Sequence, residues 1–109
     1  DGDTFVVSVV GNSSTAIGVW DIITDWNDTD TIDFQGIVAG SYAEATAADF
    51  TAAVTLANAA IAGGTDVVAV QVGADVIVFA DSANNNGTAD DAVALIGRTL
   101  ADIDSGSFI

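Results

Sequence analysis

Aspartates are concentrated in one short stretch of the chain. WDIITDWNDTDTIDFQGI, residues 20–37, contains five aspartates and no lysine or arginine. Carboxylates packed this closely repel one another, so water, a cation or hydrogen-bonded turns must compensate their charge. Aspartate oxygens suit calcium, which also takes backbone carbonyls from loops. Aspartates also close turns by accepting hydrogen bonds from backbone amides. The pattern leaves both roles open for each residue.

Enzyme chemistry is disfavoured by the residue types that the chain lacks. There is no histidine, cysteine or lysine, which removes the common general base, the thiol nucleophile and a Ser-Lys dyad. A glycosidase needs two carboxylates on either side of a sugar cleft. Such clefts usually have aromatic platforms, but Trp20 and Trp26 lie on one short segment. We therefore expect a non-catalytic domain.

The charge and length of the chain set further limits. A net charge of −15 over 109 residues repels nucleic acid and anionic membranes and attracts divalent cations. Half of the residues are hydrophobic, so one small domain with a core is expected. A domain of this size is marginal and usually gains from a staple such as a metal or a partner, and with no cysteine that staple cannot be a disulfide. No apolar run is long enough to span a membrane.

The elements that must position these acids are mostly strands. Apolar, β-branched and aromatic runs predict strands at 3–10, 19–26, 30–37, 66–72, 75–81 and 91–97. Gly73 stands first in a two-residue connection, which is typical of a type II′ hairpin turn. The last three predicted strands therefore form a meander.

An alanine-rich stretch predicts one helix at about 47–62. Thr46 and Asp49 have the spacing of a capping box at its start, with aspartate in place of the usual glutamate. Gly63 and Gly64 should end it. The side chains expected to face the core are Phe50, Val54, Ala57 and Ile61.

A second polar stretch, DSANNNGTADD at 81–91, has a spacing similar to the start of an EF-hand calcium loop. Counting back from Gly87 places Ser82 where the first aspartate belongs, and Val93 stands where the bidentate glutamate belongs. The flanking segments are predicted strands, so we interpret this stretch as a hairpin turn. Arg98, the single cation, is expected to be exposed and paired with a nearby acid.

Three stretches, in order, resemble the region that ends RTX proteins of the serralysin C-terminal type. DGDTFVVSVV resembles the end of a G-G-x-G-x-D-x-U-x calcium repeat, with Asp3 and Phe5 at the aspartate and large apolar positions. Residues 20–37 resemble the following D-x-I-x-D-F and D-x-I-D-L-S-G-I segment. Residues 78–109 resemble the C-terminal hairpin of the family.

The resemblance implies one domain, 1–109, from the C-terminal cap and secretion region of a longer, type I-secreted bacterial protein. The implied fold is mainly β, the end of a calcium β-roll followed by an antiparallel β cap or meander with the one helix. Calcium is the implied ion, and a type I secretion ABC transporter complex is the implied partner. The acids expected to bind calcium or cap loops are Asp3, Asp21, Asp25, Asp30 and Asp33. The residues expected in the export signal are Asp104, Phe108 and Ile109.

Two functions are consistent with these expectations. The first is a secreted, non-catalytic domain that directs export and caps a β-roll, with calcium promoting folding outside the cell. The alternative is a structural module of a calcium-dependent surface layer, adhesin or extracellular fibre. Neighbouring copies of the chain would then be its partners through calcium.

Overall fold

Seven strands, one α-helix and two short 3₁₀ helices make up the described part of the chain. The computed structural model describes residues 4–7, 21–27, 29–34, 41–80, 89 and 91–108. The strands are β1 (Thr4–Val7), β2 (Asp21–Ile23), β3 (Thr31–Phe34), β4 (Tyr42–Ala47), β5 (Val67–Val72), β6 (Asp75–Ala80) and β7 (Asp91–Leu95). The helices are α1 (Phe50–Ala62), η1 (Leu100–Asp102) and η2 (Ser105–Ser107). The expected mainly β class with one helix is confirmed.

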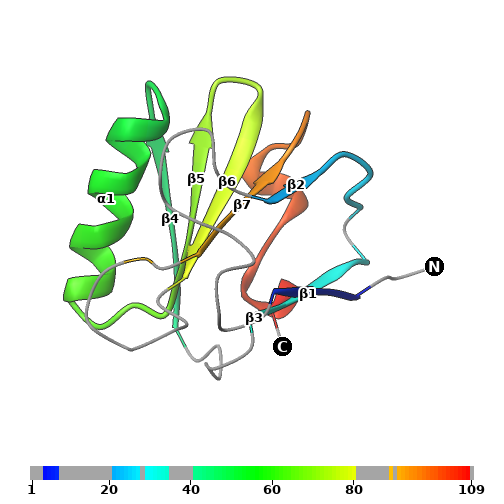
Figure 1. Cartoon of the computed structure of the whole chain (residues 1–109), viewed down its shortest axis with the longest axis horizontal. Coiled ribbons are helices and arrows are strands. Elements are labelled where there is room, and N and C mark those ends of the chain that lie inside the picture. The colour runs from blue at the N-terminus through cyan, green and yellow to red at the C-terminus, as the bar shows by residue number, and fades with distance from the viewer. Residues whose placement is uncertain are drawn as a thin grey trace.

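Five of the strands form one mixed sheet in the order β2-β7-β6-β5-β4 (Figure 1). The predicted meander is confirmed, since β5, β6 and β7 are antiparallel neighbours. Val72 pairs with Asp75 across the predicted two-residue turn, where Gly73 has the positive φ of 59° that such turns require. The two edge strands, however, run parallel to β5 and β7. The sheet is therefore antiparallel only at its centre.

The helix begins later than the sequence predicts. Asp49, not Thr46, is the N-cap, and its Oδ1 accepts a hydrogen bond from the Ala52 amide at 2.8 Å. Thr46 lies in β4, which pairs with β5 along its whole length. This pairing overrides the helix propensity of the alanines in β4. The helix ends at Gly63 and Gly64, as predicted.

One face of the five-stranded sheet is covered by α1, which packs on β4, β5 and β6. Phe50 of the helix lies against Phe79 of β6, with 5.8 Å between the ring centroids. The predicted helix face is correct for Phe50, Ala57 and Ile61. Ala53 rather than Val54 completes the buried stripe, while Val54 is partly buried.

The opposite face is covered by segments from both ends of the chain. β1 and β3 form a separate parallel two-stranded sheet, and the residues after β7 return to it through η1 and η2 (Figure 1). Ile32, Ile103 and Phe108 from these segments join the inner side chains of the large sheet in a second core. The large sheet thus lies between two apolar cores.

Candidate functional site at the C-terminal segment

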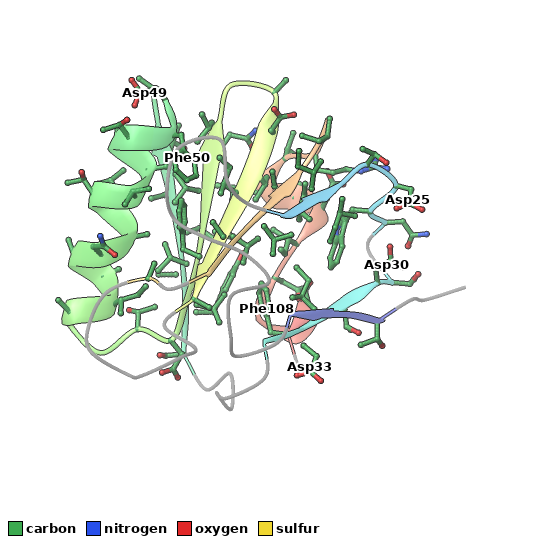
Figure 2. All side chains as sticks on the ribbon, viewed as in Figure 1. Asp25, Asp30, Asp33, Asp49, Phe50 and Phe108 are labelled. Atoms are coloured by element: carbon green, nitrogen blue, oxygen red, sulfur yellow. The ribbon has the colours of Figure 1, made fainter. Side chains whose placement is uncertain are left out.

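Four of the five acids expected to bind calcium lie in β2, β3 and the turn between them, and Figure 2 labels three of these, Asp25, Asp30 and Asp33. Asp25 is exposed, Asp33 is partly exposed and Asp30 is only 3% exposed. Asp21 begins β2, but its side chain is not described, and Asp3 lies outside the described residues. Among the residues that are described, no three acidic side chains form a group that could hold a metal. Calcium binding at these acids stays a prediction.

Asp30 closes the turn that precedes β3. Its Oδ2 accepts a hydrogen bond from the Asn27 amide at 2.9 Å, and its own amide donates to the Asn27 carbonyl at 2.9 Å. The Asn27 side chain in turn accepts from the Thr29 amide at 2.8 Å. This turn separates two fully buried side chains, Trp26 and Ile32. Asp30 therefore fills the turn-closing role that the sequence left open.

The residues predicted as an export signal lie in a segment that packs back onto the sheet. We refer to Thr99–Phe108 as the C-terminal segment. Ile103 is buried and Phe108 is 7% exposed, and Leu100 packs against the same core. Ile109, the last predicted signal residue, lies outside the described residues. Of the two described residues of the predicted signal, Phe108 is part of the second core and Asp104 is exposed.

Local hydrogen bonds shape this segment. Asp104 caps η2, because its Oδ1 accepts from the Gly106 amide at 2.8 Å. Its own amide donates to the Oγ of buried Ser107 at 3.1 Å. One turn earlier, Asp102 Oδ2 accepts from the Thr99 amide at 2.9 Å. Asp104 itself is exposed, and the turn that it caps leads directly into buried Phe108.

Gln71 of β5 anchors the start of the C-terminal segment. Its Oε1 accepts from the Leu100 amide at 3.1 Å. Its Nε2 contacts three carbonyl oxygens, those of Gly73, Asp75 and Arg98, at 3.0, 2.9 and 3.2 Å. The bond to Leu100 is the one that reaches the segment, and a neutral hydrogen bond of this kind contributes about 0.5–1.5 kcal/mol net. The sequence analysis missed Gln71, although an amide within an apolar strand was the available signal.

Further contacts hold the rest of the segment. The Trp26 Nε1 donates to the Asp102 carbonyl at 3.1 Å. Phe108 forms an isolated parallel bridge with Ile32, and its ring centroid lies 5.5 Å from that of Tyr42. The segment therefore contacts four separate elements: β5, the turn after β2, β3 and β4.

Arg98, just before the segment, differs from its prediction. It is partly buried rather than exposed, and its Nε is buried without a hydrogen-bond partner. No ion pair involves it within the described residues. Its backbone carbonyl accepts from Gln71 instead. Arg98 thus contacts β5 through its main chain, and the expected surface ion pair is not seen within the described residues.

Tyr42 lies where the segment meets β4. Its hydroxyl donates to Glu44 Oε2 at 2.7 Å. Burial raises the pKa of Tyr42 above its usual range, and the hydrogen bond to Glu44 and the negative charges of Glu44 and Asp104 raise it further. Deprotonation would place a phenolate beside two carboxylates. The folded state therefore favours the neutral hydroxyl of Tyr42.

Comparisons of the chain with protein-family models, with curated proteins and with solved structures find no match. Within the described residues, no helix is both long and apolar enough to cross a membrane. The similarity to the RTX C-terminal region therefore comes from the sequence motifs alone.

Tyr42 supplies a test of this geometry, because it is the only tyrosine in the chain and its ionisation can be followed alone by ultraviolet absorbance. Its folded-state pKa lies above the unfolded value of 10.0, so the linked stability is fully present below pH 10.0 and is lost as the pH rises beyond it. We expect tyrosinate absorbance to appear only as the protein unfolds.

Two variants act as controls for this measurement. Tyr42→Phe should remove this part of the alkaline loss of stability. Glu44→Gln should bring the pKa of Tyr42 closer to its ordinary value. Ionisation at the ordinary pKa in a fully folded wild-type protein would contradict the described environment.

Proposed function

We propose that this domain closes the end of a two-sheet parallel β structure and directs export of the protein that carries it. The main support for the proposal is that the first three strands alternate between the two sheets. β1 and β3 pair in parallel in the small sheet, while β2, between them in sequence, joins the large sheet in parallel with β7. In one coil of a β-roll or β-helix, the chain adds a strand to each of two sheets and then returns to the first sheet in parallel.

The unpaired edges of the two sheets support a capping role. β1 pairs with β3 on one side and β2 pairs with β7 on one side; within the described residues no strand pairs on the other side of either. Figure 1 shows β1 and β2 on the same side of the molecule, away from α1. An open strand edge is a template for a further strand. A preceding coil with one strand in each sheet would extend both.

The other end of the arrangement departs from the parallel order. Past β3, within the described residues, the parallel order continues only as the single bridge between Ile32 and Phe108. Past β7, the large sheet continues in antiparallel fashion through β6 and β5, with α1 over one face. A change to antiparallel strands stops a parallel stack from growing, as terminal caps do in repeat proteins.

The export role is proposed on the terminal residues. Asp104, Phe108 and Ile109 stand where the RTX-like resemblance places a C-terminal secretion signal. The partner would be a type I secretion ABC transporter complex, and the final location would be outside the cell or on its surface. We assign no catalytic role to the chain.

Calcium is proposed as the ion that stabilises the domain after export. A net charge of −15 opposes a compact state, and an ion that binds only the folded state stabilises it by mass action. The candidate ligands are Asp3, Asp21, Asp25 and Asp33, with Asp30 already engaged in its turn.

A structural module of a surface layer, adhesin or fibre is the second candidate. The edges of β1 and β2 that no described strand occupies favour it, because they can equally accept strands from a neighbouring copy. Calcium between acidic surfaces would then screen their repulsion. This module differs from a simple cap in that it assembles.

Deletion of Ser105–Ile109 tests the export role. We expect secretion to be lost while expression continues, because the truncation removes the proposed signal. Asp49→Ala is the matched control, since it removes the N-cap of α1 and destabilises the fold by about 1 kcal/mol without changing the C-terminal segment. The control should be secreted, and normal secretion of the truncated chain would refute the role.

Calcium dependence is tested on the purified chain, first with a chelator and then with excess calcium. We expect calcium to raise the unfolding temperature and increase the ordered signal in circular dichroism. Magnesium at equal concentration controls for charge screening. An unchanged spectrum and melting temperature would contradict the calcium proposal. Light scattering on the same samples separates the candidates, since a calcium-dependent increase in mass favours the assembling module.

A further inference from the structure

β4 forms one edge of the large sheet, and within the described residues no strand pairs on its outer side. It is six residues long and pairs with β5 residue by residue from Tyr42 to Ala47, without a bulge. Short length, lysine, proline and bulges are the usual features that keep an edge strand from pairing with another chain. β4 has none of these, and its one charged residue is Glu44. A single carboxylate therefore protects this edge.

The backbone groups of β4 alternate between the two sides of the strand. The Val67 amide donates to the Ser41 carbonyl at 3.1 Å, which sets the phase of the ladder between β4 and β5. Because every second residue of β4 bonds to β5, the amides and carbonyls of Tyr42, Glu44 and Thr46 point away from it. The edge thus offers an amide and a carbonyl at each of these three residues.

The flank of α1 on the β4 side is apolar. Asn58 marks the opposite flank, because its Oδ1 accepts from the Ala89 amide, two residues before β7. Leu56 lies about 160° around the helix from Asn58 and therefore on the β4 side. Its side chain is 41% exposed, and the helix carries no charged residue. Figure 1 shows α1 and β4 together, on the side of the molecule away from β1 and β2.

The side chains of β4 leave room beneath Leu56. Those of Ala45 and Ala47 face α1, and they are small and only partly buried. Those of Glu44 and Thr46 point to the other face of the sheet and are exposed. The edge therefore combines unpaired backbone groups with an apolar helix flank on one face and one carboxylate on the other.

We propose that the β4 edge and the Leu56 flank of α1 form a surface on which two copies of the chain join their sheets. Antiparallel pairing about a two-fold axis would match Tyr42 with Thr46 of the second copy and use all the outward backbone groups. Strands in a sheet are about 4.8 Å apart, so a helix above β4 and β5 would lie about 10 Å from its copy. Helices pack at about that distance.

The distribution of charge favours a second copy as the occupant. The net charge of −15 repels other copies at long range, but a Debye length of about 8 Å at physiological salt leaves the decision to charges at the contact. Residues 42–62 carry only two of the sixteen acids, Glu44 and Asp49. A second copy also brings its own uncharged helix to Leu56. The surface lies away from the β1 and β2 edges, so the inference does not rest on the proposed function.

Glu44 sets the strength of the pairing. It lies at the centre of the outward-facing residues and would stand opposite Glu44 of the second copy. Like charges directly opposite each other destabilise a strand pair. Glu44→Gln removes this repulsion, while its amide oxygen still accepts from the Tyr42 hydroxyl.

Sedimentation equilibrium of the purified chain, with a chelator present, tests for pairing. We expect a reversible monomer–dimer equilibrium that needs no calcium and strengthens with salt. Glu44→Gln should lower the dissociation constant of the dimer by about fivefold. A monomeric mass for both proteins at every concentration would overturn the inference and leave the edge to a strand of another protein. A mass that grows beyond a dimer would also contradict it, because pairing of two β4 edges closes the assembly.

Two variants of α1 with equal charge locate the surface on the helix. Leu56→Glu places a carboxylate on the flank above β4 and should abolish the dimer. Thr51→Glu is the matched control, because Thr51 is exposed and lies two turns from Asn58 on the opposite flank. It should leave the dissociation constant close to that of the wild-type chain. Equal weakening by both variants would overturn the assignment to the Leu56 flank.

Hydrogen exchange in the wild-type chain tests the strand pairing without any substitution. The amides of Tyr42, Glu44 and Thr46 point outward, so their protection should rise with protein concentration. The amides of Ala43 and Ala45 bond to β5 and should be protected at every concentration. Dimer formation without this alternating change would show that the copies meet elsewhere, and would overturn the inference.

Discussion

The central strands of the large sheet carry apolar side chains on both faces, and the rest of the structure follows from this constraint. In β5 and β6, Val67, Val68, Val78 and Phe79 are all essentially inaccessible to water, although neighbours along a strand point to opposite faces. A sheet of this kind needs a cover on each face to remove its side chains from water. One helix can cover only one face. The second cover must come from elsewhere in the chain.

The second cover comes from the two ends of the chain. Its backbone hydrogen-bonding groups are harder to satisfy than those of α1. A helix satisfies its own backbone hydrogen bonds, whereas an irregular segment on an apolar face needs partners for its amides and carbonyls. Gln71 and Trp26 supply such partners from within the core region. The segment that contains Asp104 and Phe108 is therefore held by the same contacts that complete the fold, and this links folding to the proposed function.

Sequence patterns predicted the local features of this fold better than its long-range pairings. The helix, its glycine end and the hairpin at Gly73 follow from signals confined to a few neighbouring residues. The strand at 42–47 was missed because alanine favours helices and only its pairing with β5 makes it a strand. The parallel pairing of β1 with β3, and of β2 with β7, joins segments far apart in sequence that carry no local mark of it.

Some residues of the candidate site were predicted from the sequence, but for reasons that differ from the roles that they have in the structure. Asp104 and Phe108 were selected by resemblance as export residues, and the structure places both in a segment that closes a core. The aspartates were selected for their charge, but burial and a turn decide the role of Asp30. Gln71 and Tyr42 were not selected, because the importance of each depends on contacts with residues more than 25 positions away.

Hydrogen exchange at the Leu100 amide, followed by NMR in the native protein, measures the central claim most directly. This amide donates to the Gln71 side chain, and the account requires that bond to persist in the folded state. We predict that this amide exchanges far more slowly than in the unfolded chain. In Gln71→Ala it should exchange faster than the amides of the β5–β6 hairpin. Exchange at the unfolded-chain rate in the wild-type protein, with that hairpin still protected, would show that the C-terminal segment is not docked.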